Sequence, residues 1–294
     1  KVLMLFFADS DIKMGDEEFR LLRDLVYNYS GLYFTDDNRF LLERRLSPRL
    51  SHHRLSTFHD YYYYLRYDLN RDQELSDIMD LLTTNETYFF RESFQLKAFT
   101  DEIIPEIVLK KGAGCERVLR IWSAGCSTGE EPYTIAILLL ERPELAGWKI
   151  EIIGTDISQR VLHQARKGVY GNSSFRVTEP LYKNRYFHEQ DGGYRVADRI
   201  REFVTFSRLN LYDQNRFLFL GKMDIIFCRN VIIYFDQLAK KRVIENFYST
   251  LQPGGFLLLG HSESLMNITT AFKLRHFKND MVYEKPHHND GDHH

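Results

Sequence analysis

The sequence predicts a doubly wound α/β fold that follows an all-helical N-terminal domain. The spacing of the apolar residues changes from helical to strand-like at Arg117, and short apolar runs then alternate with helical segments. In addition, the segment RVLRIWSAGCSTGEE (117–131) is typical of a strand, a glycine loop and a helix in direct succession. We therefore expect a mostly parallel sheet with an antiparallel last strand after the helical domain.

Helical periodicity covers most of the chain before residue 112. Apolar side chains recur three and four residues apart behind an acidic start at Asp16, and Gly31 is expected to end this first helix. Ser56 is placed to cap a later helix, and Pro48 is placed to kink or break the helix before it. The expected helices span residues 16–31, 36–53, 56–69, 72–82 and 93–111.

Strand-like apolar runs dominate the second half of the chain. They occur at residues 118–124, 150–155, 203–209, 223–228 and 255–260. Residues 271–277 and 281–285 predict a hairpin that turns at Asn279 and Asp280. Residues 168–202 interrupt the alternation and predict a small inserted antiparallel β subdomain.

These patterns divide the chain into domains. We expect the helical domain at residues 14–88 and the α/β domain, with its β insertion, at residues 89–286. Residues 1–13 are interpreted as an extension or a cloning remnant, because the apolar run VLMLFFA is too short for a signal peptide and meets two aspartates at once. The histidine-rich tail at residues 287–294 is expected to be disordered.

The composition is that of an ordinary globular protein. Of 294 residues 44% are hydrophobic and 27% are charged, and a net charge of −2 provides no basic footprint for nucleic acid. No apolar run approaches the roughly 20 residues that span a bilayer. The cysteines Cys115, Cys126 and Cys228 are few and lack the spacing of metal ligands, so we expect no metal site and a cytoplasmic location.

The loop AGCSTGEE (124–131) is the most informative motif. Gly125 and Gly129 allow a ligand to approach the backbone closely, whereas Glu130 and Glu131 would repel a pyrophosphate at the start of the helix. A ligand that has a cationic sulfur and an amine but lacks a phosphate fits better, which favours S-adenosylmethionine. The alternative is a plain glycine turn in a structural α/β unit.

Asp156 lies in GTDIS (154–158), at the end of the next predicted strand. An acid at this position can accept hydrogen bonds from the hydroxyl groups of a ribose. The alternative is a helix cap, because Asp156 and Ser158 both precede a helical run. The glycine loop beside it favours the ribose interpretation.

The motif CRNVIIYF (228–235) follows a buried apolar run directly. Polar residues just past the carboxyl end of such a strand face the ligand crevice of an open sheet. Arg229, Asn230 and Tyr234 are therefore placed to reach a bound ligand or substrate. The alternative for Tyr234 is burial as a core aromatic.

The segment TTNETYFFRE (83–92) lies between helical elements. Its polar start is costly to bury without partners, and ordinary linkers rarely combine such a start with three consecutive aromatics and Arg91. One interpretation is a role in the functional site. The other is a polar surface turn that caps the next helix.

The helix expected from Asn38 to Arg54 is strongly basic, with Glu43 as its single acidic residue. Arginines spaced along it predict one cationic face. This face is either a solvated helix surface or a docking surface for an acidic partner. The arginines concerned are Arg39, Arg44, Arg45, Arg49 and Arg54.

Four motifs in this order, TTNETYFFRE, SAGCSTGEEPY, CRNVIIYF and GHSESL (260–265), resemble the CheR-type glutamate methyltransferases of bacterial chemotaxis receptors. The resemblance covers about residues 16–285. It implies a helical domain, a Rossmann-like methyltransferase domain that uses S-adenosylmethionine, and an inserted β subdomain. It also places Arg91 and Tyr234 beside the reactive methyl group as catalytic residues. The donor-binding residues that it implies are Asn85, Thr87, Arg91, Glu130, Asp156, Asn210, Leu211, Arg229 and Asn230.

The resemblance implies methyl transfer to glutamate side chains of chemoreceptors in sensory adaptation, giving glutamyl methyl esters and S-adenosylhomocysteine. The implied partner is the glutamate-rich helical region of the receptor, docked by the basic helix, and we expect a monomer without nucleic acid or membrane insertion. A glutamate is already ionised at neutral pH, so no general base is required. Some family members bind a tethering peptide of the receptor through the β subdomain. The loop HEQDGGYRV (188–196) looks short for that and resembles the tether-independent members.

Two other classes of function stay open. One is a methyltransferase that acts on RNA or a small metabolite. The slightly acidic net charge disfavours RNA, and CRNVIIY stands where amino-group methyltransferases carry an Asn/Asp-Pro-Pro-Tyr/Phe signature. The other class is a donor-sensing scaffold that binds receptors without turnover. The presence of Arg91, Glu130, Asp156 and Tyr234 disfavours it.

Overall fold

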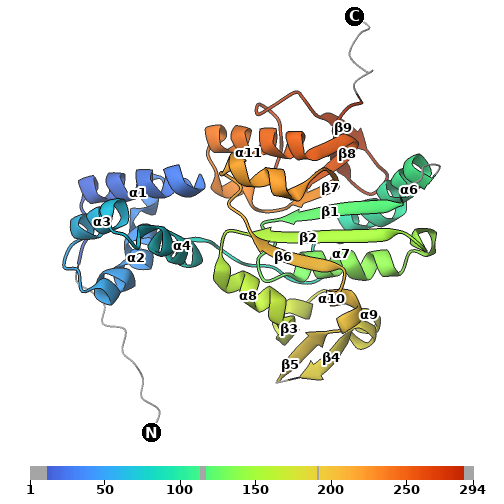
Figure 1. Cartoon of the computed structure of the whole chain (residues 1–294), viewed down its shortest axis with the longest axis horizontal. Coiled ribbons are helices and arrows are strands. Elements are labelled where there is room, and N and C mark those ends of the chain that lie inside the picture. Colours follow the sequence, from blue (N-terminus) through green and yellow to red (C-terminus); the bar gives the residue numbers. More distant parts are fainter. Residues whose placement is uncertain (1–11, 113–116, 191, 288–294) are drawn as a thin grey trace, which may run out of the picture. The chain divides into compact units, whose positions relative to one another are not determined.

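The computed structural model describes residues 12–112, 117–190 and 192–287 (Figure 1). The chain forms two compact units, the first ending at Thr83 and the second beginning at Thr84. This division falls earlier than the boundary expected after residue 88. Asn85 belongs to the second unit, where its carbonyl oxygen accepts a 3.1 Å hydrogen bond from the hydroxyl group of Ser127. The expectations for residues 1–13 and for the histidine-rich tail fall almost entirely outside the described residues.

The first unit is all-helical, as expected. Its helices bury one apolar face each, as Leu42, Leu46 and Leu50 of α2 illustrate, since all three are fully buried. The helices are α1 (Asp16–Ser30), α2 (Arg39–His53), α3 (Phe58–Tyr67) and α4 (Arg71–Leu82), and the 3-10 turn η1 (Asp36–Asn38) precedes α2 (Figure 1).

The ends of these helices follow from local chemistry. Gly31 ends α1 in the left-handed conformation, with a φ of 76°, as expected. The expectation that Ser56 caps the third helix was wrong. Thr57 caps it instead, because its hydroxyl oxygen accepts a 3.0 Å hydrogen bond from the amide of Asp60, and α3 is shorter than expected at both ends. Pro48 lies inside α2 without ending it.

The second unit is built around a seven-stranded sheet with the order β6-β2-β1-β7-β8-β10-β9 (Figure 1). Strands β6, β2, β1, β7 and β8 run parallel, and β10 and β9 form an antiparallel end, which confirms the predicted sheet. The strands are β1 (Val118–Ala124), β2 (Lys149–Asp156), β6 (Val204–Arg208), β7 (Met223–Cys228), β8 (Leu251–Leu259), β9 (Lys273–His276) and β10 (Met281–Glu284).

Helices cover both faces of this sheet. Trp122 of β1 and Phe227 of β7 point to opposite faces, because Phe227 pairs with Ser123 and side chains alternate along a strand. Phe247 of α11 packs on Trp122, and Phe99 packs on Phe227, each with ring centroids 5.2 Å apart. The helices of this unit are α5 (Ser93–Ala98), α6 (Ile104–Gly112), α7 (Glu130–Leu140), α8 (Gln159–Lys167), α9 (Pro180–Tyr186), α10 (Asp198–Arg201) and α11 (Gln237–Thr250), with a π-helical turn η2 (Phe99–Ile103) between α5 and α6.

A small antiparallel sheet is inserted between α8 and β6. Its strands β3 (Val169–Tyr170), β5 (Gly193–Val196) and β4 (Phe187–Gln190) pair in that order. Phe89 is buried against this insertion, with its ring centroid 5.1 Å from that of Phe175 and 4.8 Å from that of Phe187. The aromatic run of the motif TTNETYFFRE therefore packs the segment against the β insertion.

Candidate active site

The carboxyl ends of β6, β2, β1 and β7 meet at one edge of the sheet, because these strands are parallel neighbours. Open α/β sheets bind their ligands at this edge. The loops that begin there contain residues 125–129, 157–158, 209–213 and 229–231. We call these four loops the strand-end site. Three of the sequence motifs thus come together there although they lie far apart along the chain.

Gly125 brings two loops of the strand-end site into contact. It has a positive φ of 76°, and a Cβ atom there would lie 2.5 Å from a methyl carbon of Val231. Any side chain at position 125 would push the loop after β7 away from the loop after β1. Gly129 has a φ of 93°, and a Cβ atom there would lie 2.8 Å from Cβ of Ala165. Both glycines are therefore required by the packing of the site itself.

Asp156 ends β2 with its carboxylate turned toward the glycine loop. The two carboxylate oxygens accept hydrogen bonds from the backbone amides of Ser127 and Ser158, each at 2.9 Å. Its carbonyl oxygen accepts a 2.9 Å hydrogen bond from the amide of Leu209, which places Asn210 next in the neighbouring loop. Asp156 is thus held rigidly at the edge where a ribose is expected, and its contact with the donor stays a prediction.

The two glutamates at the start of α7 have different partners. Glu130 is buried and accepts hydrogen bonds of 2.6 and 3.0 Å from the hydroxyl groups of Thr128 and Ser174, yet burial raises its pKa. Glu131 accepts a 2.6 Å hydrogen bond from Nε of Arg229. Both carboxylates are held by the protein in the first turn of the helix. Negative charge at this position competes with the binding of a phosphate group.

Arg91 stands on a strained turn. Its neighbours Phe90 and Glu92 have φ values of 60° and 58°, a left-handed conformation that costs an ordinary residue about 1–2 kcal/mol. The amide of Phe90 donates a 3.2 Å hydrogen bond to the hydroxyl oxygen of Thr134. The guanidinium group of Arg91 donates a 3.1 Å hydrogen bond to the carbonyl oxygen of Glu86. Strain of this kind persists only where surrounding contacts hold it.

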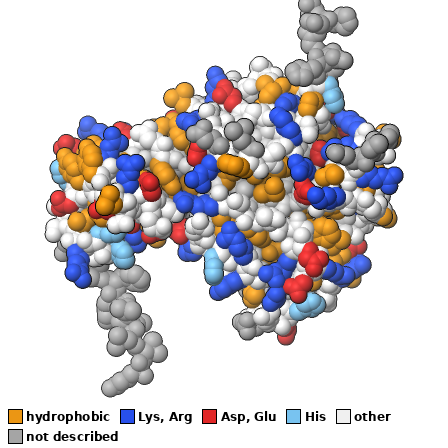
Figure 2. Space-filling view, viewed as in Figure 1, with side chains coloured by type: hydrophobic (Ala, Val, Ile, Leu, Met, Phe, Trp, Pro, Cys, Tyr) orange, Lys and Arg blue, Asp and Glu red, His pale blue; other side chains and the backbone are white. Residues whose placement is uncertain are grey.

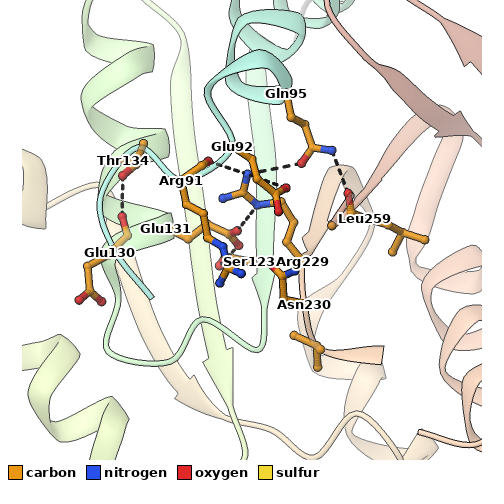
Figure 3. A network of polar contacts seen from close by, with 12 residues as sticks. Arg91, Glu92, Gln95, Ser123, Glu130, Glu131, Thr134, Arg229, Asn230 and Leu259 are labelled. Atoms are coloured by element: carbon orange, nitrogen blue, oxygen red, sulfur yellow. Dashed lines mark hydrogen bonds and ion pairs between the residues drawn. The ribbon is translucent and has the colours of Figure 1, made fainter. Parts of the chain in front are cut away.

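Arg229, directly after β7, supplies another of these contacts from a buried side chain (Figure 3). Its side chain is 4% exposed, and its Nη1 donates a 2.9 Å hydrogen bond to the carbonyl oxygen of Arg91. Glu131, which binds Nε of Arg229, also accepts a 2.7 Å hydrogen bond from Ser123 of β1. Gln95 lies 3.5 Å from the same Nη1 and donates to the backbone of β8. A hydrogen bond to a charged group contributes roughly 1.5–3 kcal/mol, enough to offset much of the strain in the turn.

Asn230 is the residue of this loop that best fits a polar ligand. Its backbone is left-handed, with a φ of 59°, and its side-chain Oδ1 is buried without a hydrogen-bond donor among the described residues. A buried acceptor without a partner costs about 1–3 kcal/mol, so a ligand that donates a hydrogen bond there is favoured. The amine of S-adenosylmethionine is such a donor, and the residues present therefore fit this ligand.

Glu263 is a site residue to which the sequence analysis assigned no role, although it lies in the motif GHSESL. Its carboxylate clamps the loop after β7, and burial raises its pKa despite the hydrogen bonds that it accepts. The motif itself was the only available signal, since nothing local shows that this acid folds back onto an earlier loop. The hydrogen bonds, of 2.8–3.2 Å, come from the backbone amides of Asn230, Val231, Ile233 and Gly260.

The remaining predicted residues lie around the same edge. Tyr234 lies on the 3-10 turn η6 (Ile232–Tyr234) and is 37% exposed, which disfavours its burial as a core aromatic. Leu211 is buried directly after Asn210, and Thr87 is half-buried in the segment before Arg91. The contacts of these residues with the donor stay predictions.

The arginines of α2 do not form the single cationic face that was expected. Nε of Arg49 donates a 2.8 Å hydrogen bond to the buried carboxylate of Glu74, and Arg45 donates to the carbonyl oxygen of Leu82 at 2.5 Å. Burial alone would raise the pKa of Glu74, but hydrogen bonds from Arg49, Tyr61 and His53 outweigh it and lower that pKa to about 2. Arg49 therefore belongs to the core of the first unit.

Two other arginines of this set remain exposed. Arg44 lies 5.7 Å from the ring centroid of Phe40, itself 67% exposed, and Arg54 is exposed in the left-handed conformation that ends α2. Arg39 forms an ion pair with Asp16. A cationic surface on α2 thus centres on Arg44 and Arg54.

Some kinds of site are absent from the described part of the chain. None of its histidine, cysteine and acidic side chains cluster in a way that could hold a metal ion. Within the same residues, no helix combines the length and apolar character needed to cross a membrane. On the face shown in Figure 2, lysine and arginine side chains are interspersed with acidic ones instead of forming one stripe.

A doubly wound sheet with an acidic glycine loop and a buried, unpartnered acceptor on Asn230 fits the class of S-adenosylmethionine-dependent methyltransferases. Comparison with known proteins shows the family within this class. Residues 85–281 match the family model of the CheR methyltransferase SAM-binding domain, and residues 17–83 match that of the CheR all-alpha domain. The chain therefore belongs to the CheR family of chemotaxis methyltransferases.

Relatives at full length support the same assignment. Chemotaxis protein methyltransferase 2 of Vibrio cholerae is 39% identical over 280 residues, which cover 95% of this chain and 96% of that protein. The chemotaxis protein methyltransferase of Borreliella burgdorferi is 38% identical over 87% of this chain and 90% of its own length. That of Escherichia coli is 33% identical over 90% of each. The predictions of a methyltransferase that uses S-adenosylmethionine and acts in chemotaxis are confirmed.

Proposed function

We propose that this enzyme transfers the methyl group of S-adenosylmethionine to glutamate side chains in the helical, glutamate-rich region of a chemoreceptor. The products are a γ-glutamyl methyl ester and S-adenosylhomocysteine. The observation that carries the proposal is the placement of Arg91, whose backbone is bonded directly to Arg229 at the end of β7. A cation on a rigid turn beside the donor site suits an anionic acceptor.

The reaction needs no general base at the strand-end site. A glutamate carboxylate is ionised at neutral pH, so no proton has to be removed before attack. One carboxylate oxygen forms a bond to the methyl carbon, and the bond from that carbon to the sulfur breaks, which neutralises both charges. Alignment of the two groups about 3 Å apart in a site without water supplies most of the acceleration.

Arg91 and Tyr234 are the residues assigned to the acceptor. The guanidinium group of Arg91 orients the carboxylate through paired hydrogen bonds. Very tight binding of the ground state would slow the reaction, so its role is orientation more than charge neutralisation. Tyr234 is exposed enough to donate one hydrogen bond to the acceptor and to shape the methyl pocket.

The docking surface for the receptor is assigned to the exposed part of α2. Arg44 and Arg54 present positive charge there, and Arg39 flanks them. A cationic surface attracts a glutamate-rich helical bundle and aligns it on encounter.

The enzyme is proposed to act as a monomer in the cytoplasm, where such a receptor region is accessible.

The β insertion is proposed to work without a tethering peptide of the receptor. Gln190, the last residue of β4, pairs with Gly193, the first residue of β5. Only two residues of the sequence lie between these strands, which supports the proposal because a short connection offers little chain for a peptide-specific extension.

The test is transfer of a labelled methyl group from S-adenosylmethionine to a receptor cytoplasmic fragment, followed by mild alkali. Release of the label as methanol establishes a carboxyl ester and supports the proposal. A label that survives alkali means methylation of nitrogen or carbon and contradicts it. Donor binding without transfer to any receptor would indicate the donor-sensing scaffold.

A further inference from the structure

We propose that Arg229 is a positioning residue, whose side chain acts on methyl transfer by holding the backbone turn that carries Arg91, and that its guanidinium group is not a ligand of the donor. The proposal deepens the function proposed above and rests on the role assigned there to Arg91. The family resemblance implies a donor-binding role for Arg229, and the proposal departs from it only for the guanidinium group.

The burial of Arg229 is the first observation. Its side chain is 4% exposed, and its donors Nε and Nη1 point to Glu131 and to the carbonyl oxygen of Arg91, at 2.6 and 2.9 Å (Figure 3). The same Nη1 lies 3.6 Å from the carboxylate of Glu92. A guanidinium group enclosed in this way has little surface left for a second, external anion.

The strain of the turn is the second observation. Arg91 lies between Phe90 and Glu92, both left-handed, so its Cα–Cβ direction depends on two backbone conformations that relax easily. Arg229 holds the carbonyl group between them. If this hydrogen bond is lost, the peptide can rotate, and the long side chain of Arg91 amplifies the rotation at its guanidinium group.

The anchoring of Arg229 is the third observation. Glu131 fixes Nε and is itself bonded to Ser123 of β1, while Gln95 bridges from Nη1 to the carbonyl oxygen of Leu259 in β8. The sheet therefore holds the guanidinium group from two strands. A continuous chain of contacts runs from the sheet core to the backbone of the catalytic turn.

The first experiment compares Arg229→Gln with a matched control, Arg275→Gln. Arg275 also forms an ion pair with a carboxylate of the same unit, the buried Glu284 of β10, although its own side chain is more exposed than that of Arg229, and it has no part in the strand-end site. For Arg229→Gln we expect kcat to fall about 100-fold, as misplacement of a catalytic group by about 1 Å does. Its Kd for S-adenosylhomocysteine should stay within about threefold, and the control should keep kcat within about twofold.

The second experiment is a double-mutant cycle of Arg91→Ala and Arg229→Gln. If Arg229 acts through Arg91, its substitution should change the residual activity of the Arg91→Ala enzyme by less than about threefold. Additive losses would mean that the two residues act independently, and equal losses in Arg229→Gln and Arg275→Gln would mean generic destabilisation. A Kd raised more than about tenfold with kcat unchanged would make the guanidinium group of Arg229 a donor ligand. Each of these results overturns the proposal.

A third readout separates this proposal from the proposed function. Hydrogen exchange of the amides of residues 89–96, measured with S-adenosylhomocysteine bound, reports the hold on the turn without any methyl acceptor. Faster exchange there in Arg229→Gln, but not in Arg275→Gln, supports the proposal even if no receptor glutamate is methylated. Unchanged exchange overturns it even if the wild-type enzyme methylates receptors.

Discussion

Glu263 holds the backbone of Asn230 in the left-handed conformation. Its Oε2 accepts a 2.8 Å hydrogen bond from the amide of Asn230, whose φ is 59°. Gly260 donates to the same oxygen, and a Cβ atom there would lie 2.9 Å from the amide nitrogen of Asn230. Gly260 and Glu263 of the motif GHSESL therefore both contact the backbone of Asn230, and this contact shapes the loop between β7 and Tyr234.

We predict that Glu263→Gln impairs both stability and turnover. Glutamine replaces one acceptor oxygen by an NH2 group, which faces backbone amides that are themselves donors, so hydrogen bonds are lost. This loss should lower the free energy of unfolding by about 1–3 kcal/mol. Loosening of the loop should lower kcat about tenfold or more. Urea unfolding and receptor methylation measure the two effects. Glu245→Gln, on the exposed face of α11, is the control and should change neither.

Arg91→Ala should keep the fold and lose at least about 100-fold in kcat, because a positioned donor to the reacting carboxylate is removed. Tyr234→Phe removes a single hydrogen bond and should cost about tenfold. Single-turnover methylation measures both, with circular dichroism as the check on folding. Near-normal turnover of the Arg91→Ala enzyme would remove this residue from the mechanism.

Asp156→Ala should weaken donor binding without abolishing the fold. Loss of a charged acceptor for ribose hydroxyls should raise the Kd for S-adenosylhomocysteine about tenfold to 100-fold. Calorimetric titration gives this value directly. Asp198→Asn, at an exposed surface position, is the control. An unchanged Kd would mean that Asp156 only organises the glycine loop through Ser127.

Charge reversal should affect receptor binding at Arg44 of α2 but the stability of the first unit at Arg49 of the same helix. Arg44→Glu should raise KM for the receptor about three- to tenfold at low salt and reduce its salt dependence, while the Kd for the donor stays constant. Arg49→Glu should instead unfold the first unit, because it sets a second carboxylate beside the buried Glu74. A selective effect of Arg49→Glu on KM, with the fold intact, would contradict this assignment.

The stability of the first unit should depend on pH through Glu74. Its pKa falls from an ordinary 4.5 to about 2 in the folded state, so the stabilisation is complete above pH 4.5 and is lost as the pH falls toward 2. The loss amounts to roughly 3 kcal/mol at most. Hydrogen exchange of peptides from α2 and α4, corrected for the intrinsic rate at each pH, measures it. Glu74→Gln should be less stable at neutral pH and should lack this dependence.

Much of the fold was predictable because its signals are local. Buried parallel strands are short apolar runs bounded by turn residues, so the bounds of β1, β2, β6 and β7 were expected within one residue of those observed. Strand β8 begins at Leu251, four residues before its expected start. The expected location of the donor site rests on one geometric rule, that parallel strands end at the same edge, and the binding of the donor there stays a prediction. The cap of α3 was predicted at Ser56 and lies at Thr57, because both side chains have a hydroxyl group and only the path of the backbone selects one.

The sequence by itself determined the fold class and the order of the domains, because the period of the apolar residues and the placement of glycines act over a few residues. It also predicts the edge of the sheet at which the donor binds. The tertiary structure alone decided the partners of the charged side chains. Arg49 is bound to Glu74, Arg229 to Glu131 and to the backbone of Arg91, and Glu263 to the loop after β7. A long charged side chain can reach many partners, and its actual partner depends on which distant segment packs beside it.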